Sequence, residues 1–426
     1  MRVSRFRLLV FGSIASAVAM ACGLELSGEL PDTFIDRQDG APDVVDATAP
    51  PSRGVVDISA GYSMTCAAMI EGPPRCWGAN DAGQLGSGIT GAGNPELSPS
   101  AAPRIVAMTE RAISISAGGF GDGVPERPFA CALGESGNVW CWGDDTWGQS
   151  GRGDAGPSPP SVPARVVNLP QDIREVHVGG SHACAAIDGE FNLYCWGRSH
   201  LGQNQTIAEA DRTPFKVPTR APVRSFSTGN YHTCAILADG TIDCWGLNTY
   251  AELGHAGTGP EVDASVVPGV ANAQVVRAGH VHTCAVHGEG KVSCFGHNVQ
   301  LQLGREPSAL SGLPDLVPLP NDAGAIDVCA GFIHSCAVLT DNTAVCWGNN
   351  LWGQLGDGTD DAGNQSAPVR VVDLRDVVKI SCGGGHTCAL DKSGNVHCWG
   401  SNEHGQLGRG DAGDPSRHAR PAPVVF

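Results

Sequence analysis

One phrase returns seven times along the 426-residue chain: a cysteine, nine or ten other residues, and then Cys-Trp-Gly or, once, Cys-Phe-Gly. The second cysteines of successive copies lie 49 to 65 residues apart. A period in this range is typical of solenoids and propellers, in which each repeat buries its apolar face against the next. The pairs are Cys66 and Cys76, Cys131 and Cys141, Cys184 and Cys195, Cys234 and Cys244, Cys284 and Cys294, Cys336 and Cys346, and Cys388 and Cys398.

Each pair brackets a predicted β-hairpin, most clearly in the fourth copy, where two β-rich runs flank a three-residue loop ending in Gly240. Such a loop favours a type I turn with a Gly bulge. If Leu237 and Thr241 close the loop, counting outward makes Cys234 and Cys244 a non-hydrogen-bonded pair. Their Cα atoms then approach to about 4.5 Å, which a disulfide accepts. We therefore expect one disulfide in each of the seven hairpins.

One strand before the hairpin and one after it give each copy four short strands, the number in one propeller blade. Seven copies predict an all-β fold, a seven-bladed β-propeller with disulfide-bonded hairpins. The repeat region begins with a β-rich segment at 55–58 and ends with another at 423–426. We expect these N- and C-terminal strands to pair within one blade and so to close the ring without a free sheet edge.

The repeated phrase resembles a known family. Gly-x-x-His-Thr-Cys-Ala-Leu followed by Cys-Trp-Gly-x-Asn-x-x-Gly-Gln-Leu-Gly, most complete over 383–408 and 331–356, resembles the regulator of chromosome condensation repeat. The resemblance covers about residues 54–426 and implies a seven-bladed propeller. It implies no particular activity, because one fold supports many functions.

Residues 1–21 are predicted to be a signal peptide. Three arginines precede an apolar stretch over 8–20 that is too short to cross a bilayer. Ala19-Met20-Ala21 is a small-x-small cleavage site directly before Cys22, an arrangement that resembles a bacterial lipoprotein signal and implies lipidation of Cys22.

The rest of the chain divides into two predicted parts. Residues 22–53, rich in proline and acidic side chains, are expected to be a disordered linker after the lipidated cysteine, and 54–426 the propeller. We expect an exported protein of the bacterial cell envelope, held at the membrane by its lipid alone. A soluble periplasmic or secreted protein is the alternative.

Two cysteines stand outside the hairpins, Cys329 and Cys382. An even number of cysteines after lipidation favours a bond between them, but alternation along their strands places the two side chains on opposite faces and favours a buried thiol at Cys382. Both possibilities stay open. His232, Cys234 and Cys244 would suit zinc, but two copies lack the histidine, so we expect a structural role and no metal or cofactor.

Charge and motifs bear on the function. A formal charge of −17 disfavours binding to nucleic acid, which requires a basic face. The sequence contains no Gly-x-x-x-x-Gly-Lys-Ser/Thr phosphate loop, and no Ser/His/Asp or HExxH arrangement stands apart from the repeat. We expect a binding or scaffold module without catalytic residues. An exported propeller hydrolase and a guanine-nucleotide exchange factor, the activity of the family's nuclear namesake, are the alternatives.

The copies diverge at two places that are candidates for binding. The residue before the Gly of Gly-Gln-Leu-Gly is often a large ring, which suits protein recognition on one rim of a propeller. The second copy also has an insertion at 119–127, which must protrude. We expect a monomer that binds a protein, or a surface glycan, through Trp147, Leu201, Tyr250, Trp352, His404, Phe120, Asp122 and Arg127. The alternative is that the rings only cover blade edges.

Overall fold

The computed structural model describes residues 54–88, 99–119, 128–153, 161–199, 202, 205, 210–257, 259–307, 312–411 and 413–426. The chain divides into two units, Met1–Pro51 and Ser52–Phe426, and all described residues lie in the second. Among the described residues, no helix has the length and apolarity that crossing a membrane requires. The predicted residues that lie outside the described ranges are Cys22, Phe120, Asp122, Arg127 and Leu201.

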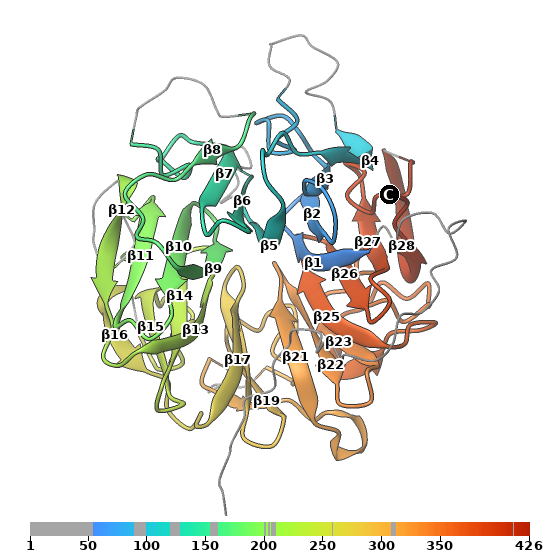
Figure 1. Cartoon of the computed structure of the whole chain (residues 1–426). Coiled ribbons are helices and arrows are strands. Elements are labelled where there is room, and N and C mark those ends of the chain that lie inside the picture. Colours follow the sequence, from blue (N-terminus) through green and yellow to red (C-terminus); the bar gives the residue numbers. More distant parts are fainter. Residues whose placement is uncertain are drawn as a thin grey trace, which may run out of the picture. The chain divides into compact units, whose positions relative to one another are not determined.

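Seven four-stranded antiparallel sheets are arranged in a ring, which confirms the predicted seven-bladed propeller (Figure 1). The innermost strands are β1 (Val55–Ala60), β5 (Ala112–Ala117), β9 (Ile173–Val178), β13 (Val223–Thr228), β17 (Ala273–Ala278), β21 (Ala325–Ala330) and β25 (Val377–Cys382). The second strands are β2 (Met64–Met69), β6 (Phe129–Gly134), β10 (His182–Ile187), β14 (His232–Leu237), β18 (His282–His287), β22 (His334–Leu339) and β26 (His386–Asp391).

The outer half of each blade is less uniform. The third strands are β3 (Arg75–Gly78), β7 (Val139–Gly143), β11 (Asn192–Gly197), β15 (Ile242–Leu247), β19 (Lys291–Gly296), β23 (Ala344–Gly348) and β27 (Val396–Asn402). The outermost strands are β4 (Ser100–Ile105), β8 (Ala164–Arg165), β12 (Asp211–Pro218), β16 (Pro260–Val266), β20 (Asp315–Leu316), β24 (Gln365–Arg370) and β28 (Asp414–Pro423). One 3-10 turn, Pro320–Asp322, links the fifth and sixth blades.

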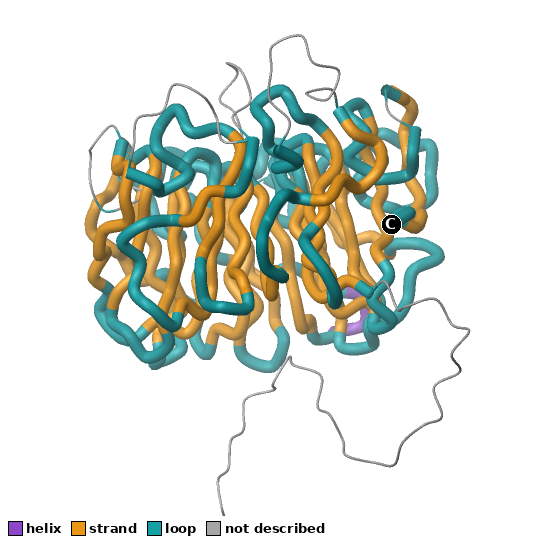
Figure 2. The backbone as a smooth tube through the Cα atoms, turned by 45° about the horizontal axis from the view of Figure 1, so that its top comes forward, coloured by secondary structure: helices purple, strands orange, loops and turns teal. Residues whose placement is uncertain are grey.

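Antiparallel order gives the ring two different faces (Figure 2). The turn after the innermost strand and the loop after the third strand leave each sheet at the same end, which we call the loop face. The hairpins between the second and third strands lie at the other end, the hairpin face. The apolar core lies between blades: each of seven buried clusters combines residues of two neighbouring sheets.

The predicted ring closure by strand exchange is wrong. Strands β1 to β4 form one complete sheet and β25 to β28 another, so every blade is continuous in sequence. The sequence pattern repeats without showing which of the four strands begins a blade. The strand before each hairpin can therefore be assigned to either of two neighbouring blades without changing the pattern. In the structure, Pro423 is the last residue of the outermost strand β28, and residues 424–426 follow it. Residues 55–58 belong instead to the innermost strand β1.

The ring instead closes by contacts between the first and last blades. The Ala60 N–H donates to Ser381 Oγ at 2.9 Å, and Lys379 forms an ion pair with Asp57. The aromatic ring of Phe426 lies edge-on to that of Trp77, with centroids 5.7 Å apart. The closing interface therefore has the same kind of contacts as the interfaces between blades adjacent in sequence.

The hairpin register is as predicted. The Leu237 N–H donates to the Thr241 carbonyl at 2.9 Å, and Gly240 has a φ of 77°. The Cα atoms of Cys234 and Cys244 are 4.1 Å apart, slightly closer than expected for a non-hydrogen-bonded pair.

All seven predicted hairpin disulfides are present in the structure. Each joins the second strand of a blade to the third strand, and none of the seven joins one blade to another. The bonds are Cys66 to Cys76, Cys131 to Cys141, Cys184 to Cys195, Cys234 to Cys244, Cys284 to Cys294, Cys336 to Cys346, and Cys388 to Cys398.

An eighth disulfide joins Cys329 to Cys382, with Cα atoms 5.5 Å apart, so the favoured buried thiol at Cys382 is wrong. The two residues lie on neighbouring blades, in β21 and β25, and the sheets of neighbouring blades stack face to face. Side chains on opposite faces of their own strands therefore point toward each other. Eight disulfides are typical of a protein that folds in an oxidising compartment.

At other interfaces between blades, a hydrogen bond joins the residues that are equivalent to these two cysteines. Elsewhere the residue equivalent to Cys329 is often a serine, and its hydroxyl accepts from the main-chain N–H of the residue equivalent to Cys382. The N–H donors and their Ser Oγ acceptors are Ala117 and Ser59 at 2.9 Å, Val178 and Ser116 at 2.9 Å, Ala278 and Ser227 at 3.0 Å, and Ala60 and Ser381 at 2.9 Å.

Removal of Val424–Phe426 is expected to lower the melting temperature, because Val424 is 8% exposed and Phe426 packs on Trp77. The loss should be roughly 2–4 kcal/mol of unfolding free energy, as for other large-to-small changes in a core. Calorimetry of the truncated protein measures it. Val425→Ala is the control, since Val425 is 68% exposed and should leave the melting temperature unchanged. Equal melting of truncated and intact protein would contradict closure by these residues.

Candidate functional site

The loop after each third strand is fixed to the next blade at one main-chain carbonyl. In five blades the indole N–H of the next blade's tryptophan donates to the carbonyl of the loop glutamine. The tryptophan–glutamine pairs are Trp77–Gln406 at 2.9 Å, Trp142–Gln84 at 2.9 Å, Trp196–Gln149 at 2.8 Å, Trp347–Gln302 at 2.9 Å and Trp399–Gln354 at 2.9 Å. The Trp and Gln of the repeated phrase are thus halves of one inter-blade contact.

At three of these five carbonyls a hydroxyl from the second strand of the next blade is a second donor. The equivalent residues of the other two blades are Ala130 and Ala183. The Thr387 hydroxyl donates to the Gln354 carbonyl at 2.9 Å, and the Ser335 hydroxyl to that of Gln302 at 2.9 Å. The glycine that follows allows the indole to approach: a Cβ on Gly356 would lie 2.6 Å from the indole nitrogen of Trp399. These contacts explain why Trp, Thr, Gln and Gly recur at fixed spacing.

Buried histidines complete the contact and are structural. His334 Nε2 lies 2.9 Å from the Thr387 hydroxyl. Because that hydroxyl already donates to a carbonyl, it accepts from the imidazole N–H. Desolvation by burial lowers the pKa of His182, His232, His334 and His386 to about 3. The neutral form stabilises the fold above about pH 6.5, and its contribution is lost as the pH falls toward 3.

The same observations bear on the zinc alternative. Cys234 and Cys244 are bonded to each other, and His232 Nε2 lies 2.8 Å from the Thr283 hydroxyl. All three side chains of that hypothetical site are therefore engaged in structural contacts.

The variable residue of each loop is held by its main chain. Its N–H donates to the side-chain oxygen of the Gln or Glu two positions later: 2.7 Å from Trp147 to Gln149, and 3.0 Å from Trp352 to Gln354. The backbone is therefore fixed whatever the side chain is. This geometry explains how the position tolerates Ala82, Trp147, Tyr250, Gln300, Trp352 and His404 in different blades.

The large aromatic side chains at this position pack against the next blade to different extents. The Arg198 guanidinium lies 4.5 Å from the centroid of the Trp147 ring, and both Trp147 and Trp352 are half-buried. Tyr250 contacts His297 with ring centroids 4.5 Å apart, yet it remains 48% exposed. Of the predicted rim residues that the structure describes, Tyr250 therefore offers the most open aromatic surface. His404 is also half-buried.

Exposed aliphatic side chains extend this surface along consecutive blades. The residue before the variable position is Val299 in the fifth blade and Leu351 in the sixth, 67% and 54% exposed. Together with Tyr250 and Trp352 they form what we call the apolar arc, over the fourth to sixth blades.

A second group of rings lies nearer the centre of the same face and was not predicted. Phe332 contacts Tyr62 and His280, with centroid distances of 5.4 Å and 4.3 Å, and Tyr231 lies 6.5 Å from His280. We call these four residues the central aromatic cluster. Each follows a strand-end glycine directly or by one residue, and comparison of that position between copies would have revealed the cluster.

Glycines allow the central aromatic cluster to extend across the seventh blade. A Cβ on Gly384 would lie 2.9 Å from the Tyr62 ring and 2.4 Å from the Tyr62 carbonyl. The seventh blade therefore has no side chain where the rings of the first and sixth blades meet. The apolar arc and the central aromatic cluster together form the candidate site.

One buried carboxyl group lies beneath the apolar arc. Glu252 occupies the glutamine position of the fourth loop, is 1% exposed, and accepts from the Tyr250 N–H at 2.7 Å. Its other oxygen has no hydrogen-bond partner among the described residues. Desolvation raises the pKa of Glu252 to about 7. It supports the loop as glutamine does elsewhere, and its protonated form matches that role best.

Glu252→Gln is therefore expected to stabilise the protein, and more so at higher pH. A pKa raised from 4.5 to about 7 in the folded state makes the wild type lose stability as the pH rises from about 4.5 through about 7. The variant should gain up to roughly 3 kcal/mol at pH 8 and little at pH 4.5. Thermal unfolding across this range measures the difference. Gln354→Glu, the reverse change in the sixth blade, should destabilise with the opposite pH trend, and a pH-independent effect in both variants would contradict the assignment.

Comparisons with known proteins agree with the repeat and the fold. Residues 18–374 match the model of the RCC1-like domain, and residues 377–406 and 393–426 match that of the regulator of chromosome condensation (RCC1) repeat. The ultraviolet-B receptor UVR8 of Arabidopsis thaliana is 30% identical over 380 residues, 87% of this chain and 82% of the receptor. The probable E3 ubiquitin-protein ligase HERC4 of Homo sapiens is 38% identical over 237 residues, 52% of this chain but 22% of the ligase.

Solved structures show the same architecture. Prp20p from Saccharomyces cerevisiae superposes with a TM-score of 0.72 and 21% identity, over 88% of each chain. Human WBSCR16 gives a TM-score of 0.69 and 21% identity, over 80% of this chain and 87% of that one. With the seven-bladed structure and the repeated inter-blade contact, these matches confirm the resemblance inferred from the sequence: the chain belongs to the regulator of chromosome condensation repeat family.

Proposed function

We propose that this protein is a non-catalytic binding propeller that recognises a protein partner through its loop face. The observation that supports this most strongly is the apolar arc, in which exposed Tyr250, Val299 and Leu351 lie on consecutive blades. Exposed apolar groups that gather on one face mark interaction surfaces. A hydrogen bond to a Gln or Glu side chain holds the main chain of each of these loops, which reduces the conformational entropy lost on binding.

Charge around the arc favours a basic partner. Asp360 and Asp361 lie in the same loop segment as Leu351 and are exposed, and Glu306 is exposed in the loop that follows Val299. A partner surface with apolar side chains flanked by lysine or arginine would complement this arrangement. Its association should slow as the salt concentration rises, since steering by charge is screened.

Related propellers support this class of function. Prp20p, which shares the fold, is described by its binding to Gsp1p and histones. The Arabidopsis relative is a receptor, and the human relative is a much longer ligase whose matched part is 22% of its length. These relatives support a binding or regulatory role for a propeller of this kind and nothing more specific.

We further propose that the propeller acts in the bacterial cell envelope, anchored by a lipid on Cys22 through the linker at 22–53. The eight disulfides support an oxidising, exported setting, and the short apolar segment before Cys22 supports lipidation.

Variants of the arc test the binding face. Tyr250→Ala and Leu351→Ser should each weaken partner binding at least about tenfold, as central apolar contacts do, with little change in melting temperature because both side chains are exposed. Affinity capture from native envelope, followed by titration of the recovered partner, measures this.

Phe191→Ala is the matched control, since Phe191 is 54% exposed next to the hairpin face. It should bind as wild type does. Retained binding by both arc variants, or loss only in the Phe191 variant, would refute the loop face as the interface. Recovery of a glycan in place of a protein would refute the partner class.

Cys22→Ser should move the protein from the membrane fraction to the soluble fraction of cells that export it, because no other anchor is proposed. Fractionation and metabolic labelling with a fatty acid measure both parts. A wild-type protein that is already soluble and unlabelled would contradict the lipid anchor.

A further inference from the structure

All seven innermost strands contain a bulge at the same position, the second residue of the strand. Register shifts at this residue in every blade: in the first between Val55 and Asp57, for example, and in the fourth between Val223 and Ser225. A bulge redirects the side chain of the extra residue away from the regular alternation. The seven residues, in blade order, are Val56, Ile113, Arg174, Arg224, Gln274, Ile326 and Val378.

The innermost strands line the central channel of a propeller. An innermost strand has a neighbouring blade against each face and the second strand along one edge, so its open side is the channel. The four apolar members have nearly equal exposures, 39% for Val56, 40% for Ile113, 43% for Ile326 and 40% for Val378. Because their exposed fractions are nearly equal, these four side chains occupy equivalent environments in their blades. Since each strand begins at the hairpin face, the ring lies at the channel mouth on that side.

The ring formed by the seven bulge residues has an apolar half and a polar half. The sixth, seventh, first and second blades, which are consecutive around the circle, contribute only Ile326, Val378, Val56 and Ile113. The third to fifth blades contribute Arg174, Arg224 and Gln274. In a seven-membered circle the fourth blade lies opposite the seventh and first. Arg224 is therefore across the channel from Val378 and Val56.

Most charges of the innermost strands are paired. Asp57 is paired with Lys379, Glu175 with Arg174 at 3.6 Å, and Asp327 with Arg277 at 3.3 Å. These strands hold four Lys or Arg residues and three acidic ones, so one cation is left over in a protein whose total charge is −17.

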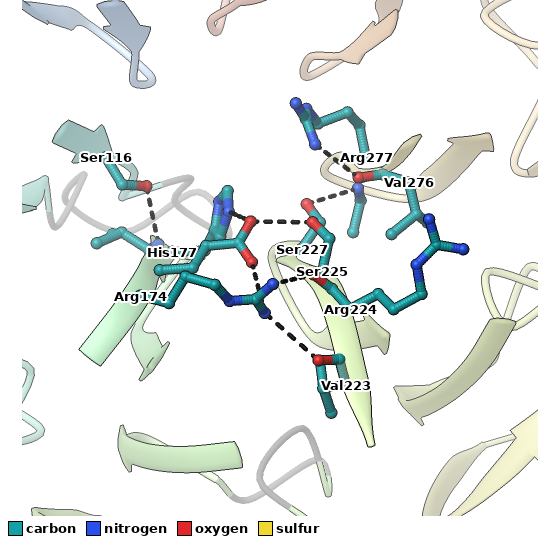
Figure 3. Close-up of polar contacts among 12 residues, drawn as sticks. Ser116, Arg174, His177, Val223, Arg224, Ser225, Ser227, Val276 and Arg277 are labelled. Atoms are coloured by element: carbon teal, nitrogen blue, oxygen red, sulfur yellow. Dashed lines mark hydrogen bonds and ion pairs between the residues drawn. The ribbon is translucent and has the colours of Figure 1, made fainter. Parts of the chain in front are cut away.

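The remaining cation is Arg224. Arg224 is an exposed residue, and its guanidinium has no acidic or hydrogen-bonding partner among the residues that the structure describes. Figure 3 shows its neighbour Arg174 instead directed to main-chain carbonyls of β13, with Val223 O at 3.5 Å and Arg224 O closer. Gln274 is likewise occupied by the Gly288 carbonyl at 2.8 Å. Arg224 is thus the open donor of the polar half.

We propose that the channel mouth on the hairpin face binds an aliphatic carboxylate. The guanidinium of Arg224 donates two hydrogen bonds to the carboxylate, the geometry that this pair favours. The hydrocarbon chain lies across the channel against Val56, Ile113, Ile326 and Val378 and removes their exposed surface from water. This site is separate from the loop face and does not depend on the partner proposed there.

Titration calorimetry of the full mature protein tests the site with acetate, hexanoate and octanoate at pH 7. Affinity should rise about two- to fourfold for each added methylene, as expected for burial of apolar surface. Octylammonium, with the same chain and the opposite charge, should not bind. Absence of octanoate binding at millimolar concentration, or equal binding of octylammonium, would overturn the proposal.

Variants separate the two halves of the ring. Arg224→Gln should weaken octanoate binding at least about tenfold, and the matched control Arg375→Gln, an exposed arginine before β25, should change it less than twofold. Val56→Ser combined with Val378→Ser should reduce the gain from chain length, since only Ile113 and Ile326 remain, while leaving acetate unaffected. Thermal unfolding of each variant establishes that it is folded. Unchanged octanoate affinity in folded Arg224→Gln would overturn the assignment of the arginine.

Discussion

The propeller depends on one repeated contact, in which the tryptophan of one blade, joined by a hydroxyl at three of the described interfaces, donates to a single main-chain carbonyl of the preceding blade. The Trp399 indole N–H and the Thr387 hydroxyl both reach the Gln354 carbonyl. A buried carbonyl with two lone pairs is fully satisfied by this pair of donors, and an apolar side chain in place of either would leave it partly unpaired. The contact therefore stabilises the ring and also fixes the angle between neighbouring blades.

With the loop held in this way, its conformation does not depend on the side chain at the variable position. Because the glutamine side chain holds the N–H of the variable residue, the main chain there needs no help from the side chain it carries. Rings, an amide and a methyl group all occur at one backbone position as a result. The loop face therefore has a fixed main chain on which the recognition residues can vary, and Glu252 is the one described glutamine position where the repeat has another residue.

The sequence was sufficient for the features that lie within one repeat. Blade number, hairpin register and the pairing of Cys234 with Cys244 follow from local spacing. What failed required knowledge of the neighbouring blade. The bond between Cys329 and Cys382 depends on two sheets facing each other, and the contact of Phe332 with Tyr62 depends on the ring bringing the sixth blade near the first. The repeat does not show at which strand each blade begins, so the sequence could not predict how the first and last blades close the ring.

The serine-to-cysteine substitution at one interface shows how covalent and non-covalent joints interchange in this fold. Cys329 stands where Ser59, Ser116, Ser227 and Ser381 accept a main-chain hydrogen bond from the next blade. Two cysteines placed at any of those four interfaces would occupy the positions that the existing disulfide already uses, without a new backbone path. The architecture thus contains a set of latent cross-links, and together with the existing disulfide they could join the blades covalently at five of the seven interfaces.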